Sequence, residues 1–466
     1  MRKITIVGAG QFGLHLGIGL RRKGFDVTIV TNRTGEQIRK GPILSSQILF
    51  GPVLQMEERL GLNPWAKEGG HAAAANFSVA WGTGASPMLG WRHPVQHVVG
   101  GVLGKLGKPL MAWDHALPGP GGQSVDQRLK MPVWMDIFEK EGGRLVIDQV
   151  DVGKLETLAK DCDLLIVSAG KGEISALFDR DHEKCTFERP QRHLAMVYVH
   201  GLKPCGSGVP SACYSIIPGI GEYVTFPCLT LSGPCDILMF ESQFDGAMHE
   251  MMKGAKSANE VLAAGLKILK SFVPWEADRC DDLTIADPLA SLSGAVTPIV
   301  RKPIAKLPSG RAILGGGDVV VLNDPLTGQG SNNASKHANV ILQAIIDQGD
   351  APFDQAFMQR TFDTHWQSAK WVCRFTNFML STEPAEPLPT LMNSATQRSR
   401  LREAFLGGFF DASVYANWLF DPKEAKRKIA TCTGAPQPRE PISKREHPTK
   451  SASSRIGMAA RPASNS

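Results

Sequence analysis

The sequence predicts an α/β fold with a first domain on a parallel sheet, an interleaved second domain on a mainly antiparallel sheet, and C-terminal helices. Three patterns support this prediction. A strand-turn-helix-strand pattern fills the first thirty residues, strand-like runs alternate with turns over 190–300, and helical patterns dominate 353–429. Hydrophobic residues make up 42% of the 466 residues and charged residues 21%, which excludes wholesale disorder.

The first domain begins with a strand at Ile4–Val7 that runs into a glycine-rich turn. Gly8, Gly10 and Gly13 form a GxGxxG pattern and open a helix that is predicted to reach Arg22. In such a turn the first glycine permits tight turning, the second leaves room for a pyrophosphate, and the third lets the helix pack on the sheet. The helix N-terminus also favours an anion. This context makes a Rossmann-like dinucleotide site the better interpretation than a βα turn without a ligand.

Ribose recognition is less clearly indicated. A dinucleotide fold usually carries Asp or Glu at the end of the second strand to bind the ribose hydroxyls. Here that strand, 27–30, is followed by Thr31, Asn32 and Arg33. Asn32 could hydrogen-bond a hydroxyl and Arg33 would equally favour a phosphate, so both remain candidate cofactor residues.

A second glycine-rich segment, 315–330, joins a predicted strand to a helix that is predicted to end at Ile346. Asp318 could accept hydrogen bonds from a polyol, and the N–H groups at 328–330 could face an anionic ring system. Alone this would be an ordinary loop, but together with the N-terminal turn it predicts an extended cofactor site. The candidate residues are Gly317, Asp318, Pro325, Gly328, Gln329 and Gly330.

These motifs resemble those of flavoprotein monooxygenases with the FAD-binding hydroxylase fold. The strand and small-residue turn that end at Gly170 lie between the two glycine-rich segments, in the order of that family. The resemblance implies that Gly317 and Asp318 bind the FAD ribitol and that the following helix points at the flavin pyrimidine edge. It also implies that Arg128 lies near the cofactor.

The closer resemblance, over most of 1–430, is to styrene and indole monooxygenases. It implies the oxygenase component of a two-component system, in which an NADH-dependent reductase supplies reduced FAD. With O2 this would form a flavin hydroperoxide that epoxidises or hydroxylates a small aromatic such as indole or styrene. The phrases that carry it are Gly8-Ala9-Gly10, Gly13-Leu14-His15-Leu16-Gly17, Glu141-Gly142-Gly143, Ala169-Gly170-Lys171, Pro190-Gln191-Arg192, Asp324-Pro325-Leu326-Thr327-Gly328-Gln329-Gly330 and Thr376-Asn377-Phe378.

Two alternatives remain open. One is a single-component NAD(P)H-dependent FAD aromatic hydroxylase, although the Asp-Gly motif of those enzymes does not follow the turn at 169–174. The other is a non-catalytic FAD-binding chaperone or sensor.

The candidate substrate pocket near the flavin comprises Ser45, Ser46, Gln47 and Leu49. Ser45 and Gln47 match the Ser-x-Gln-x-Met pattern of the indole-type branch, with Leu49 in place of Met. A dry, mostly apolar pocket protects a reactive oxygenating species, and a few hydroxyls or amides there can hold an indole N–H. The alternative is that Ser45 and Gln47 are ordinary polar loop residues.

The expected domain boundaries are 1–190 with 300–350 for FAD, 191–299 for the substrate, 351–433 for C-terminal helices, and 434–466 for a disordered tail. Residues 80–123 are expected to be an irregular excursion. The tail holds six basic and two acidic residues, so it carries +4 of the formal net charge of +6. The remainder is nearly neutral, which argues against a nucleic-acid partner.

The remaining expectations concern location and partners. No apolar run reaches the ~18 residues of a membrane span, and the N-terminus reads as a strand rather than a signal peptide, so we expect a cytoplasmic protein. Nine cysteines without a CxxC pair indicate reduced thiols, and no metal site is expected. The expected partners are a small aromatic substrate and the reductase, and a homodimer remains open.

Overall fold

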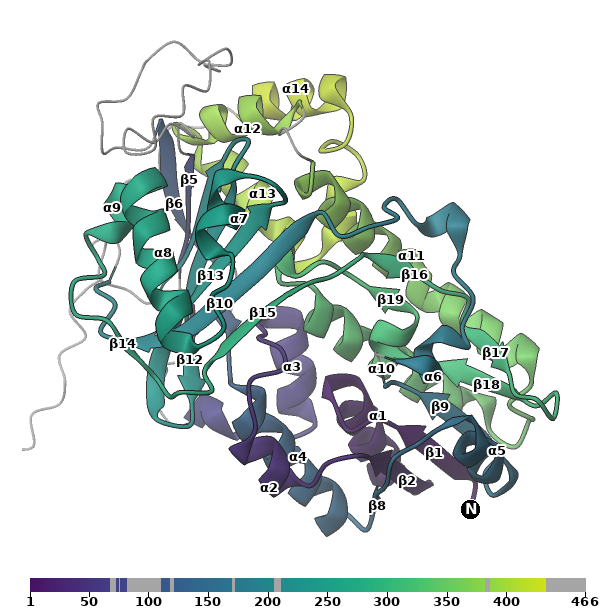
Figure 1. The fold of residues 1–466 in the computed structure, drawn as a ribbon. Helices are drawn as coiled ribbons and strands as arrows, with labels where there is room; N and C mark the ends of the chain where they lie inside the picture. Colours follow the sequence, from purple (N-terminus) through teal and green to yellow (C-terminus); the bar gives the residue numbers. More distant parts are fainter. Residues whose placement is uncertain are drawn as a thin grey trace, which may run out of the picture.

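The computed structural model describes residues 1–67, 73–74, 76–81, 110–117, 121–169, 172–204, 211–381 and 386–432. Two large sheets organise this part of the chain, one mainly parallel and one mainly antiparallel, with helices packed around both (Figure 1). Predictions that concern Gly170, the tail 434–466 and most of the 80–123 excursion lie outside the described residues.

The parallel sheet forms the first layer. The order of its strands is β17-β18-β9-β1-β2-β8, and all neighbours are parallel except the edge pair β17–β18. The central strands are short apolar runs that are buried on both faces, as a helix-covered parallel sheet requires. The strands are β1 (Lys3–Val7), β2 (Asp26–Thr31), β8 (Arg144–Ile147), β9 (Leu164–Val167), β17 (Ile304–Lys306) and β18 (Ala312–Gly315).

Helices cover both faces of this sheet. On one face, α1 (Gln11–Arg22), α4 (Gln127–Lys140) and α10 (Gly330–Gln348) share an apolar core with β1 and β2. On the other face, α5 (Val152–Lys160) packs on the opposite side chains of the same strands. The two helices predicted to end at Arg22 and at Ile346 are therefore confirmed, and α10 extends two residues beyond its predicted end.

The antiparallel sheet forms the second layer. Its order is β14-β10-β13-β12-β11-β5-β6, and β15 pairs with β10. The strands are β5 (Asn76–Trp81), β6 (Met111–Ala116), β10 (Arg192–His200), β11 (Ser211–Ile217), β12 (Gly221–Thr230), β13 (Gly233–Gln243), β14 (Thr284–Ile285) and β15 (Ser291–Ala295).

Strands β5 and β6 correct two predictions. They come from within 1–190, so part of the range assigned to the FAD domain belongs to the second sheet. Strand β6 also lies inside the stretch expected to be irregular. The physical reason is that β5 pairs in parallel with β11, and a parallel neighbour comes from a distant part of the chain that local patterning does not reveal.

The two faces of the second sheet have different covers. One face packs on α7 (Ala247–Met252), α8 (Ala258–Phe272) and α9 (Pro274–Ala277). The other face packs toward the C-terminal helices, which confirm the helical prediction for 353–429 (Figure 1). These helices are α11 (Gln355–Met379), α12 (Leu388–Ala395), α13 (Ser399–Phe410) and α14 (Pro422–Thr431).

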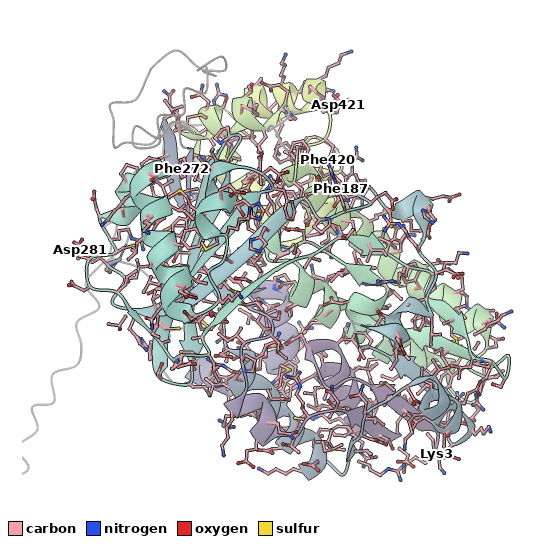
Figure 2. The ribbon with its side chains drawn as sticks, in the orientation of Figure 1. Lys3, Phe187, Phe272, Asp281, Phe420 and Asp421 are labelled. Atoms are coloured by element: carbon pink, nitrogen blue, oxygen red, sulfur yellow. The ribbon has the colours of Figure 1, made fainter. Side chains whose placement is uncertain are left out.

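The shorter elements connect the two layers. Lys3 in β1 and Asp421, which caps α14, lie at opposite ends of the molecule in Figure 2. The shorter elements are α2 (Gly35–Lys40), β3 (Leu49–Phe50), α3 (Gly51–Arg59), η1 (Pro64–Lys67), β4 (Ala73–Ala74), β7 (Gly122–Gln123), α6 (Glu173–Ala176), η2 (His182–Lys184), β16 (Ile299–Val300), η3 (Gly317–Val319), β19 (Val321–Leu322), η4 (Pro325–Thr327) and η5 (Ala412–Tyr415).

A buried ion cluster around Arg128 ties the layers together. Its Nη2 lies 2.8 Å from Asp126 Oδ2 and 2.8 Å from Asp287 Oδ2, and only 3% of the side chain is exposed. Asp126 caps α4 and also accepts a hydrogen bond of 2.6 Å from the Thr230 hydroxyl at the end of β12. Arg128 thus joins the start of α4 to the second sheet and to the segment after β14. Because both carboxylates accept hydrogen bonds from it, Arg128 acts as a link between the layers.

We expect Arg128→Met to lower the free energy of unfolding by about 3 kcal/mol, because it leaves Asp126 as an uncompensated buried charge. Chemical denaturation of the purified variant measures this change. The control is Arg427→Met, which removes an exposed ion pair with Glu424 and should cost less than about 1 kcal/mol. Equal effects of the two substitutions would contradict the assignment of Arg128 as a link between the layers.

Candidate active site

Two adjoining cavities lie between the sheets. The helix-end cavity encloses about 160 Å³ and lies at the start of α1 and of α10. The sheet cavity encloses about 260 Å³ and lies between the second sheet, residues 44–50 and residues 322–331. The two cavities share four lining residues, so they form one continuous site. These are Ser45, Asp318, Gly330 and Ser331.

The first glycine-rich turn shapes the helix-end cavity. Gly8 has a φ of +117°, and a Cβ on Gly13 would lie only 1.9 Å from the Gly8 carbonyl oxygen. These two glycines therefore allow α1 to start directly on the sheet. Gly10 differs, because a Cβ there would meet no atom within 4 Å. The space that its missing side chain leaves is the cavity itself.

The second glycine-rich segment closes the other end of the same cavity. Gly330 is the first residue of α10, and a Cβ there would also meet nothing within 4 Å. Gly317 and Gly328 have φ values of +58° and +65°, which favour glycine. Two helix N-termini thus face one space, with the Asp318 side chain at the junction of the cavities. The arrangement suits a diphosphate at one helix end, a polyol at Asp318, and an electron-rich ring edge at the other helix end.

A buried polar network holds the start of α1. The Gln11 amide donates to Glu57 Oε1 at 2.7 Å and to Ser335 Oγ at 2.8 Å, and Lys130 Nζ lies 2.7 Å from Glu57 Oε1. Burial raises the pKa of Glu57 and lowers that of Lys130, while each charge counteracts the shift of the other. The network connects α1, α3, α4 and α10, the helices that surround the cavity.

A stacked pair of buried histidine rings holds the backbone next to Asp318. His337 Nδ1 accepts a hydrogen bond from the Gly317 N–H at 3.2 Å, and its ring stacks on His365 with centroids 4.0 Å apart. Burial lowers the pKa of both rings, for His365 to about 3. Both imidazoles are therefore neutral at physiological pH, and His337 remains able to accept the bond that orients the Gly317–Asp318 backbone.

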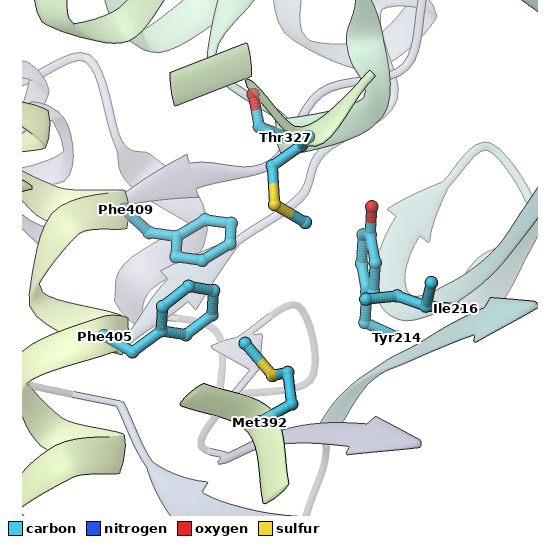
Figure 3. A pocket seen from close by; sticks show the side chains of 7 residues that line it. Tyr214, Ile216, Thr327, Met392, Phe405 and Phe409 are labelled. Carbon is cyan, nitrogen blue, oxygen red and sulfur yellow. The ribbon is translucent and has the colours of Figure 1, made fainter. Parts of the chain in front are cut away.

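Alternating residues on the second sheet form the apolar wall of the sheet cavity. Asn323, Thr327 and three residues of 44–50 add polar groups to an otherwise hydrophobic lining. Tyr214, Thr327 and Phe409 continue into a small apolar pocket of about 10 Å³, where Phe405 and Met392 lie opposite Tyr214 and Ile216 (Figure 3). The wall residues from the sheet are Leu194, Met196, Ala212, Tyr214, Val224, Phe226, Met239 and Leu292.

The predicted pocket segment lines the sheet cavity with one exception. Ser45, Ser46 and Gln47 all line it. The Gln47 amide donates to the Val125 carbonyl at 3.3 Å, and its buried Oε1 has no hydrogen-bond partner among the described residues. Leu49 instead packs with Val53 and Leu54, while its neighbours Ile48 and Phe50 line the cavity. The reason is strand alternation, which turns Leu49 to the opposite side of β3.

The remaining predicted cofactor residues do not all line the two cavities. Pro325 and Gly328 line the sheet cavity, whereas the Gln329 amide donates to the Phe409 carbonyl at 3.0 Å and holds α13 in place. Asn32 is exposed, Arg33 is partly buried, and neither lines a cavity.

Several lining residues were not predicted from the sequence, although Gln11 and Phe12 lie inside the first glycine motif and Ser331 directly follows the second. Gln127 precedes Arg128 and lines the helix-end cavity in its place. For Gln11, Phe12 and Ser331, this position within or next to a glycine motif was the available signal. The missed residues of this cavity are Gln11, Phe12, Gln127, Ser168, Ser331 and Ala334.

In the described ranges, no three His, Cys, Asp or Glu side chains are grouped to hold a metal ion. The same ranges contain no helix that is long and apolar enough to cross a membrane.

Comparison with known proteins identifies relatives of the same kind. Residues 170–279 match the family described as "Styrene monooxygenase A putative substrate binding domain". The styrene monooxygenase StyA of Pseudomonas fluorescens is 31% identical over 395 residues, which cover 83% of this chain and 87% of that protein. A StyA from another Pseudomonas is 30% identical over the same coverage.

Solved structures show the same fold at lower identity. The flavin-dependent brominase Bmp2 matches with a TM-score of 0.61 and 14% identity, covering 92% of this chain and 97% of the brominase. The p-nitrophenol 4-monooxygenase PnpA of Pseudomonas putida matches with a TM-score of 0.56 and 13% identity, covering 88% of this chain and 98% of PnpA. These solved structures share the fold, and the two sequence relatives establish that the chain belongs to the styrene monooxygenase StyA family.

Proposed function

We propose that this protein is the oxygenase component of a two-component system that uses externally supplied reduced FAD and O2 to oxidise a small aromatic compound. The observation that carries this proposal is that the two cavities adjoin at Asp318, so that a cleft between two helix N-termini lies beside an apolar chamber. Bound reduced flavin would supply the oxygen-activating chemistry, so the protein needs no acid–base pair of its own.

The residues of the helix-end cavity fit FAD. The open space at Gly10 and the α1 N-terminus would receive the diphosphate, and Asp318 would accept hydrogen bonds from the ribitol hydroxyls. The N-terminus of α10 at Gly330 would face the pyrimidine edge of the flavin and stabilise negative charge there. The apolar wall of the sheet cavity would exclude water from the reacting atoms.

Indole is the substrate that the sheet cavity favours, with styrene as the alternative. Gln47 Oε1 is a buried acceptor without a partner in the described structure, and an indole N–H would satisfy it. The rest of the lining is mainly hydrophobic and would accept either ring.

Electrons would come from NADH through a separate reductase. The support is the sequence, in which the Asp-Gly motif of single-component hydroxylases does not follow the turn at 169–174. A single-component enzyme of the same fold remains the competing function. Diffusion of reduced FAD from the reductase to this chain requires a reversible cofactor site.

The two-component function predicts that the purified protein with NADH or NADPH alone oxidises almost no indole. Addition of FAD and a flavin reductase should start the reaction, which is followed by the appearance of indigo. The reductase and FAD without this protein serve as the control. Rapid NAD(P)H consumption by the protein alone would instead establish the single-component alternative.

Gly10→Ala should weaken FAD binding by about tenfold or more, because the new methyl group enters the space that the diphosphate needs. The melting temperature should stay unchanged, since Gly10 has a φ of −94° and its Cβ meets no protein atom. Gly407→Ala is the matched control, because its Cβ also lies in open space but far along the chain on α13. Fluorescence titration measures FAD affinity, and an unchanged affinity in Gly10→Ala would contradict the placement of the diphosphate.

Gln47→Leu keeps the size of the side chain but removes the acceptor for an indole N–H. We expect kcat/KM for indole to fall by about tenfold or more, while kcat/KM for styrene changes far less, because styrene has no N–H to lose its partner. Both values are measured with supplied reduced FAD. Equal losses for the two substrates would show that Gln47 does not recognise the N–H.

A further inference from the structure

An acidic cross-strand pair lies just beyond the wall of the sheet cavity. Glu222 on β12 and Glu241 on β13 are directly opposite each other in the antiparallel register. Val224 and Met239, the next residues on the same sheet face, line the cavity. Glu222 and Glu241 are 4% and 1% exposed, so both carboxyl groups are buried.

One guanidinium, that of Arg192, forms an ion pair with one member of this pair. Arg192 on β10, part of the Pro190-Gln191-Arg192 motif, binds Glu222 through two hydrogen bonds of 2.8 and 3.0 Å. Its Nη1 also donates to the Leu380 carbonyl. Neither carboxyl oxygen of Glu241 has a hydrogen-bond partner among the described residues. The guanidinium charge is therefore paired with Glu222, and Glu241 is buried without a counterion of its own.

A third carboxyl group comes from the cofactor layer. Asp324 is 1% exposed and directly precedes residues 325–328, which line the sheet cavity. Its Oδ1 accepts the Leu326 N–H at 3.0 Å, so the side chain shapes this loop. Three buried carboxyl groups thus lie where the second sheet meets the loop that leads into α10, and only Glu222 forms an ion pair with Arg192.

Electrostatics indicates which of these groups holds a proton. Burial is the largest cause that raises the pKa of Glu241 well above its usual value. The negative charges of Asp324 and Glu222 raise this pKa as well, and the positive charge of Arg192 lowers it. Burial also raises the pKa of Asp324 to about 7, against the opposing effects of the Leu326 N–H and Arg192. Burial, and after it the charges of Glu222 and Glu241, raise the pKa of the Tyr214 phenol on β11 well above its usual value, so the phenol stays neutral.

We propose that Glu241 and Asp324 form a buried proton-holding pair whose protonation is coupled to FAD binding, with Glu241 protonated at neutral pH and Asp324 taking up a proton when FAD binds. The proposal rests on the FAD site of the proposed function and not on the aromatic substrate. Both residues are positioning residues, since neither lines a cavity.

The sign of this coupling follows from charge. In the proposed placement, FAD brings negative charge to the two adjoining cavities, with its diphosphate at Gly10 and its pyrimidine edge at Gly330. Added negative charge favours the protonated form of a buried carboxyl group. By linkage, protonation of Asp324 then tightens FAD. Because the raised pKa lies near neutrality, the affinity is highest at low pH and falls as the pH rises through about 7. The slope can reach about tenfold per pH unit, the limit for one coupled proton.

Calorimetric titration of the full-length protein with FAD tests the coupling directly. Titrations at pH 7.5 in two buffers of different ionisation enthalpy should show net uptake of a fraction of a proton for each FAD bound. Asp324→Asn keeps an oxygen that can accept the Leu326 N–H but cannot titrate, so it should abolish the uptake and flatten the dependence of FAD affinity on pH. Asp347→Asn, an exposed substitution on α10, is the matched control and should keep both.

Infrared spectroscopy of the protein without FAD tests the state of Glu241 independently. The wild type at pH 7 should show the carbonyl stretch of protonated carboxylic acids. Glu241→Gln should lose the Glu241 part of this band and keep the part from Asp324, which is partly protonated at its pKa of about 7. This measurement also covers the case in which Asp324→Asn fails to fold.

FAD binding without proton uptake, or the absence of a protonated carboxyl band in the wild type, would overturn this inference alone. Failure to bind FAD at all would overturn the proposed function instead.

Discussion

The convergence of two helix N-termini on one space is the constraint on which the rest of this structure depends. Helix α1 can begin directly on the parallel sheet only because Gly13 has no side chain where it meets the Gly8 carbonyl. Helix α10 reaches the same space from a distant part of the chain and packs along α1. The buried Gln11–Glu57–Lys130 network and the His337–His365 stack keep these helix ends in register. Everything that follows, including the position of Asp318, depends on this packing.

The buried charges divide into two kinds with different consequences. Around Arg128 and around Lys130, each cation has a carboxylate at hydrogen-bonding distance, so these clusters act as links between layers. Around Arg192, the carboxyl groups exceed the available partners, because Glu241 has no hydrogen-bond partner among the described residues, and the cluster lies behind the loop that joins the two cavities. A protein can compensate for such an excess by holding protons, which makes this cluster responsive to the charge of a bound cofactor.

Structural features that depend on neighbouring residues could be predicted from the sequence, whereas features that depend on distant residues could not. Gly8, Gly10 and Gly13 could be assigned from one turn, and the start of α10 from the glycine-rich loop before it. Leu49 was misplaced because its orientation depends on the alternation of β3, which the sequence does not reveal. The role of Arg128 depends on Asp287, 159 positions away. The cavity wall was missed for the same reason, since Met196, Tyr214 and Met239 come together only through strand register.

The account as a whole requires that oxygen reaches the substrate from reduced FAD bound between α1 and α10, without a nicotinamide bound to this chain. A single-turnover experiment with ¹⁸O₂ tests this most directly. FAD is reduced chemically under argon, mixed with the protein and indole, and then exposed to ¹⁸O₂ in the absence of NADH and reductase. The account predicts an oxidised indole product that carries one ¹⁸O atom, while the second atom leaves as water. The absence of a labelled product, despite oxidation of the FAD, would contradict it.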